Sequence, residues 1–364
     1  MGTLLMLALL LVPAIAVVPG VAVADDRTVT VMARNVYHGV NNEIFAVPTA
    51  TGFADLLVKV AAVYNGYFAR KFHERAAVMA AEIDRTRPDL IGLQEAVLVR
   101  TQAPPDGPAT PATTVALDYV QILLDALAAR GLRYEVVVQS IGLDAELPSA
   151  LGFDVRHTDR EVILVRADRD KPRLKLSNAQ AGNFVTNCTL PGSVTGPISI
   201  RRGWAAVDAK VRGKSFRFIT THLDGDCLPF TSAIQQAQAA ELLAGPAATQ
   251  LPVVLVGDLN SPGDGSGVTY NAVTAAGFAD AAVLGGVGLP TCCQAGDLLN
   301  ATSMADTRID FVLFRGDFEV RDAAVVGFHP RRSRTPSGLW ASDHAGVVAT
   351  LRFSRGHGHD DDED

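Results

Sequence analysis

The chain has 364 residues, of which 48% are hydrophobic and 20% are charged. This is enough apolar material to bury the core of one large or two ordinary domains, and it excludes a largely disordered protein. The net charge is −7, but the five acidic residues at 360–364 supply five of these negative charges, so the rest of the chain carries −2. Phosphate neutralisation dominates the affinity of nucleic-acid binders, so the absence of a basic excess weakens the case for such a substrate.

The first 24 residues carry no charge and form one long apolar run. The run ends in Ala-Val-Ala at 22–24, the small-x-small pattern that precedes cleavage of a secretory signal peptide. A membrane anchor is the alternative, because the run is about long enough to cross a bilayer, but two prolines and Gly20 interrupt it. We therefore expect a signal peptide at 1–24, cleaved near Ala24, and an exported protein with no stable membrane span after cleavage.

The segment after the signal peptide begins with a predicted strand and continues into predicted helices. Alternating residues at 28–33 indicate a strand that delivers Asn35 at or just past its end. At 53–87, alanine, leucine and valine recur at three- and four-residue spacing, which favours helix, and Pro88 ends the pattern. We expect two helices here, broken near residues 65–66.

The next elements are a strand, a loop and a helix. A short apolar run at 89–93 predicts a buried strand that presents Gln94 and Glu95 at its carboxyl end. A proline-rich loop follows at 103–111, and residues 115–130 have a helical pattern that ends at a glycine.

The remainder of the chain is rich in strands, with one further helix at 231–244. The predicted strands are 134–139, 161–166, 173–176, 203–211, 215–221, 252–257, 309–314, 319–326 and 346–353. Many of these strands follow one another without a helix between them, which predicts substantial antiparallel pairing. No interdomain linker is visible, so we expect one domain at 25–353. The tail at 354–364 has almost no apolar content and is predicted to be disordered, with weak metal binding as the alternative.

The four cysteines of the chain are expected to form disulfides, because an exported protein meets an oxidising compartment. Cys188 and Cys227 are the first candidates for a bridge. The adjacent Cys292 and Cys293 either join each other or bond elsewhere, and four cysteines allow three connectivities. No CxxC spacing typical of a zinc site is present.

Asp258 and Asn260 follow an apolar strand in the pattern Gly-Asp-x-Asn. A carboxylate at the end of such a strand can accept a proton from water while the neighbouring amide fixes its position. The alternative is an Asx turn that caps the strand. A calcium-binding loop is rejected, because its twelfth position would be Thr269 and not glutamate.

Three further strand edges carry polar residues. Asp310 interrupts an apolar strand, and a buried carboxylate is costly unless a histidine or a metal satisfies it. Asp343 and His344 precede the last strand, where an imidazole beside a carboxylate can be held in a defined protonation state, although a simple cap is the alternative. His222 ends another apolar strand, and its alternative is a histidine satisfied within the core.

In chain order, these polar residues resemble the pattern of the endonuclease/exonuclease/phosphatase family, the deoxyribonuclease I-like superfamily. The resemblance rests on six short motifs at the edges of predicted strands: Asn35, Gln94-Glu95, His222, Gly257-Asp258-Leu259-Asn260, Arg308-Ile309-Asp310 and Ser342-Asp343-His344. It spans nearly the whole predicted mature chain and, with the predicted export, suggests a secreted bacterial-type member. It implies an α+β fold, a four-layer α/β/β/α sandwich of two packed, mainly antiparallel sheets flanked by helices.

The resemblance also implies a metal site and a site for activating water. Asn35, Glu95 and Asp343 would bind Mg²⁺, or Mn²⁺ or Ca²⁺ in its place, as suits a hard cation that takes oxygen ligands. Asp258 would orient or deprotonate the attacking water, and Asn260 would position the phosphate or the water.

The remaining implied roles concern the phosphate. Asp310 would hold His344 against the phosphoryl oxygens, and His222 would contact the phosphate from another side. Arg160, whose planar guanidinium suits phosphate, would bind it as well. Some family members have an acidic partner for the histidine at this position, and Asp144 and Glu146 are the candidates for such a partner of His222.

The implied function is hydrolysis of phosphodiester or phosphomonoester bonds by metal-assisted attack of water, carried out by a secreted monomer. The substrate would be a nucleic acid, a phospholipid or a small phosphate ester. The alternatives are an extracellular nuclease, a sphingomyelinase-like phospholipid phosphodiesterase, and a noncatalytic binding protein on the same fold. A nuclease is not favoured, because the body of the chain is nearly neutral and only 6% of the residues are aromatic.

Overall fold

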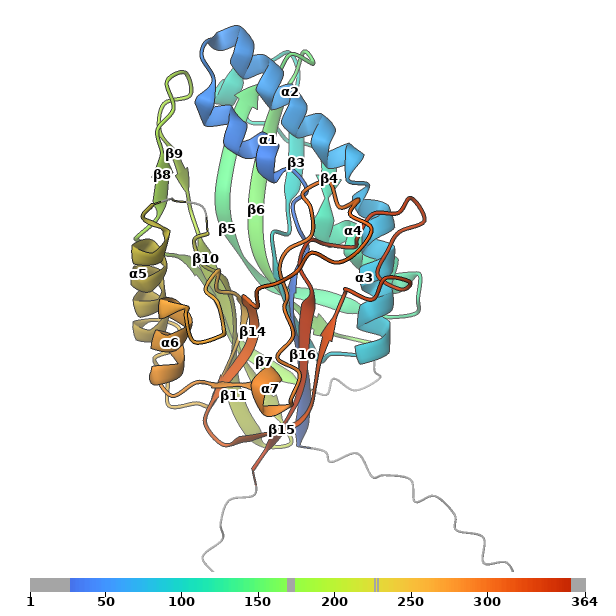
Figure 1. Ribbon diagram of the computed structural model, residues 1–364, viewed down its shortest axis with the longest axis vertical. Helices are drawn as coiled ribbons and strands as arrows, with labels where there is room; N and C mark the ends of the chain where they lie inside the picture. Colours follow the sequence, from blue (N-terminus) through green and yellow to red (C-terminus); the bar gives the residue numbers. More distant parts are fainter. Residues whose placement is uncertain (1–26, 169–173, 226, 228, 355–364) are drawn as a thin grey trace, which may run out of the picture.

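A computed structural model of the protein describes residues 27–168, 174–225, 227 and 229–354. The predicted signal peptide at 1–24 and residues 355–364 of the predicted acidic tail lie outside the described residues. Two β-sheets lie face to face at the centre of the molecule, and helices cover their outer faces (Figure 1).

The first sheet has eight strands in the order β15-β16-β1-β2-β6-β3-β4, with β5 also paired to β6. β1 runs parallel to β2, and the other neighbouring strands in this sheet are antiparallel. The strands are β1 Thr28–Asn35, β2 Leu90–Gln94, β3 Leu98–Gln102, β4 Thr114–Asp118, β5 Tyr134–Pro148, β6 Asp154–Arg166, β15 Phe318–Val326 and β16 Gly346–Phe353.

The second sheet has six strands in the order β13-β14-β12-β11-β10-β7. β11 runs parallel to β12, and the other pairs are antiparallel. The strands are β7 Lys175–Asn183, β10 Gly203–Val211, β11 Lys214–His222, β12 Val253–Asp258, β13 Ala279–Asp280 and β14 Asp310–Arg315. A separate pair consists of β8 Cys188–Leu190 and β9 Ile198–Ile200.

The core between the sheets arises from the two-residue period of the strands, because successive side chains point to opposite faces. In β1, Val29 and Val31 lie in the core that both sheets share, whereas Met32 lies in the core beneath the helices. In β11, Phe218 faces the other sheet and Ile219 faces the helices of its own side. Each sheet is therefore buried on both faces, which explains the continuous apolar runs in its central strands.

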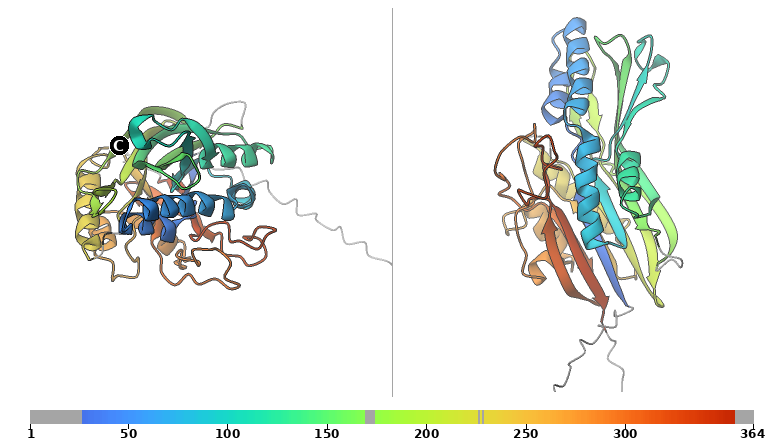
Figure 2. Two further views of the ribbon diagram at one scale, coloured as in Figure 1. Left: turned by 90° about the horizontal axis from the view of Figure 1, so that it is seen from above. Right: turned by 90° about the vertical axis from the view of Figure 1, so that its right-hand side faces the viewer.

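Helices form the two outer layers (Figure 2). Met79 and Leu123, from two helices, share a core with Leu93 of the first sheet, and Leu242 shares a core with Leu255 of the second. The helices are α1 Asn41–Ala46, η1 Val47–Thr49, α2 Phe53–Ala69, α3 Phe72–Thr86, η2 Gly107–Ala109, α4 Tyr119–Ala128, α5 Thr231–Ala244, α6 Val268–Ala275 and α7 Ala281–Leu284. The predicted sandwich of two largely antiparallel sheets with flanking helices is confirmed. Within the described part of the chain, no helix is both long and apolar enough to cross a lipid bilayer.

The break between the first two long helices lies at Arg70 and Lys71, so the predicted break at 65–66 is wrong. Lys71 adopts a left-handed conformation with φ of 41°, and α3 starts after it. Gly66 lies inside α2, where a Cβ atom would come within 2.7 Å of Val40 Cγ1. The glycine therefore serves close packing of a neighbouring segment and does not interrupt the helix.

The predicted helix at 115–130 is wrong in its first residues. Residues Thr114–Asp118 form β4, which pairs with β3, and the helix α4 begins only at Tyr119. Asp118 caps this helix by accepting a hydrogen bond from the backbone N–H of Val120 at 3.0 Å. Pairing with a neighbouring strand outweighs the local helical pattern here, because Val115 finds a partner in Arg100 of β3.

The predicted strands at 134–139 and 161–166 are parts of much longer strands. β5 extends to Pro148 and β6 starts at Asp154, and together they form a hairpin that rises beyond the sandwich beside α1 and α2 (Figure 1). The predicted strand at 173–176 corresponds to β7, which runs from Lys175 to Asn183. The inner face of this hairpin lines a pocket.

Candidate functional site

The strands of both sheets place polar residues at one end of the sandwich. Asn35, the last residue of β1, lies opposite Gln94, which ends the parallel strand β2. In the other sheet, Asp258 at the end of β12 lies opposite His222 on one side and Asp310 on the other. Pairing between strands thus brings together residues that are distant in the sequence.

These strand ends surround a pocket that we call the acidic pocket. The residues that line it are Tyr37, His38, Asn41, Glu95, Arg202, His222, Gly225, Asp258, Asn260, Cys292, Cys293, Asp343 and His344. Asn35 and Asp310 lie directly behind it and hold lining residues by hydrogen bonds. Of the nine residues predicted to act on the metal, the water or the phosphate, the structure gathers eight here, and Arg160 is the exception.

Asn35 connects the two sheets at this site. Its Nδ2 donates to Glu95 Oε1 at 2.9 Å and to Asp258 Oδ2 at 3.2 Å, while its Oδ1 accepts from the backbone N–H of Tyr37 at 2.9 Å. Glu95 also accepts from the backbone N–H of His38 at 2.8 Å. Burial opposes ionisation of Glu95, but the charge of His38, the largest of several opposing effects, brings its pKa below the usual range.

Asp258 is held in place by a turn and by a glycine. The backbone N–H of Asn260 donates to Asp258 Oδ1 at 2.8 Å, so the Asx turn considered from the sequence is present. Gly257 has a φ of 141°, and a Cβ atom there would lie 2.0 Å from the carbonyl oxygen of Thr221. Burial, and then the charge of Asp310, raise the pKa of Asp258 to about 7.

His344 forms a buried pair with Asp310, since its Nδ1 lies 2.9 Å from Asp310 Oδ2. Burial alone would lower the pKa of His344, but the carboxylates of Asp310, Asp343 and Asp258 raise it well above its ordinary value. His344 is therefore an imidazolium at neutral pH. Its Nε2 lies 3.9 Å from Asp343 Oδ1, and burial raises the pKa of Asp343 to about 7.

His222 has a cationic neighbour where an acidic partner was expected. Arg202 Nη1 lies 2.9 Å from His222 Nδ1 and 3.6 Å from Asp159 Oδ2. Burial and then the charge of Arg202 lower the pKa of His222 well below its usual value. Donors face both ring nitrogens, because Asn260 Nδ2 lies 3.0 Å from Nε2, and Nε2 also lies 3.6 Å from Asp258 Oδ2.

The two carboxylates suggested as partners of His222 lie elsewhere, and that suggestion is wrong. Asp144 accepts hydrogen bonds from Arg156, whose Nε lies 2.8 Å from its Oδ1. Glu146 accepts from the backbone N–H of Ala112 at 2.8 Å. Both residues lie on the β5 strand of the long hairpin, whose length the sequence pattern underestimated.

Arg160 supports the backbone next to the site. Its guanidinium donates to the carbonyl oxygen of Ala96 at 2.7 Å and to Asp118 Oδ1 at 2.5 Å. These bonds fix the segment that follows Glu95. The phosphate-binding role of Arg160 stays a prediction, and Arg202 is the arginine that lines the acidic pocket.

Several lining residues were not singled out from the sequence. His38 lies three residues after Asn35, and Arg202 immediately precedes β10, so a search near the ends of predicted strands could have found both. Asn41 comes from the short helix α1, which the sequence pattern did not predict.

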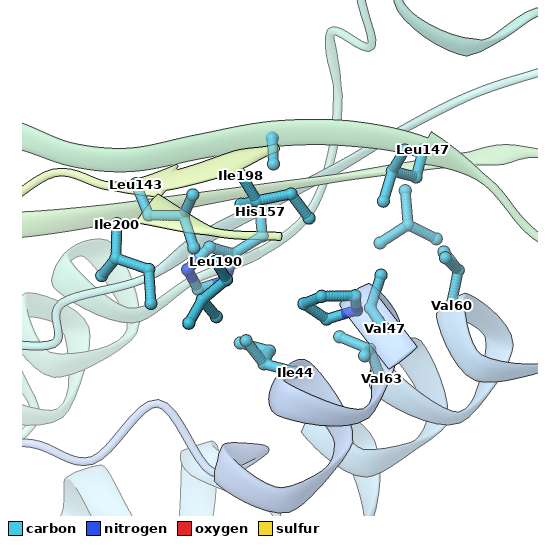
Figure 3. A pocket seen from close by; sticks show the side chains of 13 residues that line it. Ile44, Val47, Val60, Val63, Leu143, Leu147, His157, Leu190, Ile198 and Ile200 are labelled. Atoms are coloured by element: carbon cyan, nitrogen blue, oxygen red, sulfur yellow. The ribbon is translucent and has the colours of Figure 1, made fainter. Parts of the chain in front are cut away.

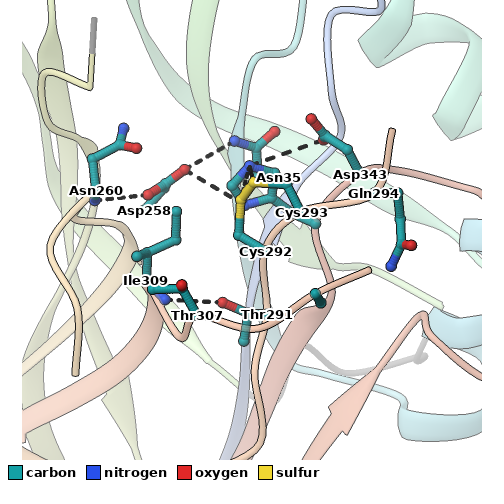
Figure 4. The surroundings of a disulfide bond; sticks show 12 residues. Asn35, Asp258, Asn260, Thr291, Cys292, Cys293, Gln294, Thr307, Ile309 and Asp343 are labelled. Atoms are coloured by element: carbon teal, nitrogen blue, oxygen red, sulfur yellow. Dashed lines mark hydrogen bonds and ion pairs between the residues drawn. A yellow bond between two sulfur atoms is a disulfide. The ribbon is translucent and has the colours of Figure 1, made fainter. Parts of the chain in front are cut away.

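Both cysteine pairs are joined in the structure, and Figure 4 shows the surroundings of the Cys292–Cys293 pair. The predicted Cys188–Cys227 disulfide is present, with a Cα–Cα distance of 5.5 Å. Cys292 and Cys293 are joined to each other and border the site, because their Sγ atoms lie 3.6 Å and 3.9 Å from His344 Nε2.

The side chains of the acidic pocket fit a hard divalent cation. Glu95, Asp258, Asp310 and Asp343 are all buried, and Oδ1 of Asp310 has no hydrogen-bond partner among the described residues. Asp258, Asp310 and His344 form a buried group whose ligand atoms lie within 4.8 Å of one another. Buried carboxylates need a compensating positive charge, and carboxylate and amide oxygens are the ligands that Mg²⁺ and Ca²⁺ take.

Comparison with solved structures shows a shared fold. A protein of the endonuclease/exonuclease/phosphatase family from Leptotrichia buccalis C-1013-b is 16% identical, with a TM-score of 0.54, covering 89% of this chain and 100% of the other. Humanized D. rerio TDP2 is 15% identical, with a TM-score of 0.53 and coverage of 90% and 99%. The Bacteroides thetaiotaomicron mannosyl-6-phosphatase Bt3783 is 16% identical, with a TM-score of 0.52 and coverage of 89% and 100%.

A comparison with curated protein sequences gives no match. The sequence pattern that defines the Endonuclease/Exonuclease/phosphatase family, however, matches residues 62–344. That range takes in Glu95, His222, Asp258, Asp310 and His344, and it covers more than half of the chain. The protein is therefore a member of the endonuclease/exonuclease/phosphatase family, with that family's phosphoester hydrolase fold.

Proposed function

We propose that the protein is an exported, Mg²⁺-dependent enzyme that hydrolyses phosphoester bonds by attack of water. The placement of Asp258 carries the proposal, since its Oδ2 lies 3.6 Å from both His222 Nε2 and His344 Nδ1 in a buried pocket. A carboxyl group with a pKa of about 7 can take a proton from water at neutral pH. Asn260 holds this carboxylate through its backbone N–H and faces His222 with its side chain.

Two histidines of different charge would face the phosphoryl group. His344 donates a hydrogen bond from its Nδ1–H to Asp310, so its Nε2–H is left to donate to a phosphoryl oxygen as negative charge develops. The neutral His222 lies on the β11 side of the pocket, between Arg202 and Asn260. Preorganised donors of this kind stabilise the transition state more than the ground state, because the charge that they face grows during the reaction.

Asn35, Glu95 and Asp343 are the residues that we assign to Mg²⁺. A bound Mg²⁺ would polarise the phosphoryl oxygens and neutralise their negative charge. Asn35 and Glu95 are already joined by a 2.9 Å hydrogen bond, which holds the amide beside the carboxylate. Mn²⁺ or Ca²⁺ suits the same oxygen ligands.

The first test is hydrolysis of DNA, RNA, sphingomyelin and small phosphate esters in parallel, with Mg²⁺ and with a chelator. We expect Asp258→Ala and His344→Ala to lower kcat by at least about 100-fold without unfolding the protein. Glu95→Ala should in addition weaken Mg²⁺ binding, measured by calorimetry. Asp264→Ala is the control, because this carboxylate lies exposed in the loop before α6.

Two results would refute these assignments. Full turnover by the Asp258→Ala or His344→Ala variant would remove the proposed roles of these residues. Activity that is indifferent to the chelator would remove the proposed dependence on Mg²⁺.

Export is supported by two independent features. The apolar segment at 1–24 ends in the small-x-small pattern of a cleavage site. The Cys188–Cys227 disulfide is of the kind that persists in oxidising compartments.

A further inference from the structure

A second pocket, which we call the apolar pocket, lies between the long β5–β6 hairpin, the helices α1 and α2, and the β8–β9 pair. Its volume is about 60 Å³. Twelve of its thirteen lining residues are apolar, and Figure 3 shows that their side chains point into a common space. Ile44 comes from α1, Val63 from α2, Leu143 from β5 and Ile198 from β9. Leu143 and Ile198 are only half-buried, so the pocket is open to an incoming ligand.

His157 is the one polar residue that lines the apolar pocket, and it brings no charge. Its Nδ1 lies 2.5 Å from the hydroxyl oxygen of Tyr67, which satisfies that nitrogen. Burial lowers the pKa of His157 to about 3, so the ring is neutral at physiological pH. The pocket therefore favours an uncharged, apolar occupant.

The apolar pocket adjoins the acidic pocket at three places. In α1, Asn41 lines the acidic pocket and Ile44 lines the apolar one, and residues three apart share a helix face. At the end of β9, Ile200 lines the apolar pocket, and Arg202, two residues later, lines the acidic one.

The third link is between two histidine rings. His157 of the apolar pocket meets the ring of His38 edge-on, with 6.2 Å between the ring centroids. The backbone N–H of His38 donates to Glu95 in the acidic pocket. The two pockets are therefore neighbours.

We propose that the apolar pocket binds a short apolar group of the substrate, an alkyl chain or a small ring esterified to the phosphate that the acidic pocket holds. This inference rests on the proposed function and specifies its substrate class. A water-sized group needs about 10–15 Å³ in a cavity, so a volume of about 60 Å³ takes a group of about four to six carbons. The long acyl chain of a membrane lipid exceeds this volume.

The test uses n-alkylphosphonates from methyl to dodecyl, which carry the same anionic head and are not hydrolysed. Binding to the full protein with Mg²⁺ is measured by calorimetry, beside an assay of phosphate-ester hydrolysis. Each buried methylene should strengthen binding about fourfold. We expect the dissociation constant to fall along the series up to about six carbons and then to level off.

Two substitutions should remove this dependence on chain length. Ala145 lines the pocket from β5, and Ala145→Phe fills it, so the affinity for hexylphosphonate should approach that for methylphosphonate. Ile198→Asn makes the wall of the pocket polar and should also weaken the dependence of affinity on chain length. Thermal melting shows whether each variant is folded, and Ile198→Asn replaces Ala145→Phe as the test if the latter does not fold. Ala276→Phe is the matched control, because Ala276 is exposed after α6 on the other side of the sandwich, and it should bind the series like the wild type.

The outcomes separate this inference from the proposed function. A flat series in a wild-type protein that hydrolyses phosphate esters overturns the apolar subsite alone. An affinity that keeps rising up to dodecylphosphonate also overturns the short apolar subsite, and it would indicate a site for a lipid chain. An unchanged dependence of affinity on chain length in a folded Ala145→Phe variant overturns the subsite as well. A wild-type protein that neither hydrolyses any ester nor binds methylphosphonate overturns both.

Discussion

At the scale of single residues, burial and then the charge of Arg202 lower the pKa of His222, whose Nδ1 lies 2.9 Å from Arg202 Nη1. Replacing Arg202 by glutamine removes a charged hydrogen bond worth about 1.5–3 kcal/mol, so kcat/KM should fall about 10- to 100-fold. The pKa of His222 should rise, because the guanidinium that repels a protonated ring is gone. NMR titration of the His222 ring measures this shift. Arg201→Gln is the control on an exposed neighbour and should change neither quantity, and an unmoved His222 pKa in Arg202→Gln would contradict the assignment.

Asp310 acts on two titrating groups at once. Its charge raises the pKa of His344 and also contributes to the pKa of about 7 at Asp258. Activity needs Asp258 ionised and His344 protonated, so kcat/KM should rise with pH through the first pKa and fall through the second. Asp310→Asn lowers both values, and both limbs of the pH profile should move to lower pH. A profile that stays in place or moves to higher pH would show that Asp310 does not set these charges.

At the scale of secondary-structure elements, Gly66 allows α2 to pack against the segment before α1. Alanine favours a helix over glycine by about 1 kcal/mol, but a Cβ atom at this position lies 2.7 Å from Val40 Cγ1. Overpacking of a buried site costs about 1–3 kcal/mol, so Gly66→Ala should destabilise the protein on balance. Asn65→Ala, one residue earlier and exposed, should be neutral or stabilising. Urea unfolding compares the two, and a stabilised Gly66→Ala variant would disprove the packing role.

The strands that build the site were predictable because each one is an apolar run followed by a polar residue. That pattern marks β12 before Asp258 and β11 before His222, and the layered fold follows from many such strands. The start of α4 and the break after α2 were not predictable, because pairing of β4 and packing at Gly66 depend on residues distant in the sequence. Arg202 precedes a predicted strand, so a search near strand ends could have named it, but only the fold shows that it lies beside His222.

At the scale of the whole molecule, the Cys188–Cys227 disulfide links the β8–β9 pair to the segment that follows β11. It spans 39 residues, and a loop of this length corresponds to about 4 kcal/mol of stabilisation in the chain-entropy description. Cys188→Ser with Cys227→Ser should lose about that much in urea unfolding. Cys292→Ser with Cys293→Ser is the control, because adjacent residues close no long loop. Equal losses in the two double variants would contradict the entropic account.

The proposed export and the cysteine pairs lead to one further prediction for the intact protein. All four cysteines are paired in the structure, so thiol titration of the exported protein, denatured without reductant, should detect no free thiol. The same material should begin near Asp25 on N-terminal sequencing, since cleavage is expected after Ala24. Expression that keeps the protein in a reducing cytoplasm provides the control, and there we expect four titratable thiols. Four thiols in the exported protein, or an intact segment at 1–24, would show that the chain does not mature in an oxidising compartment as proposed.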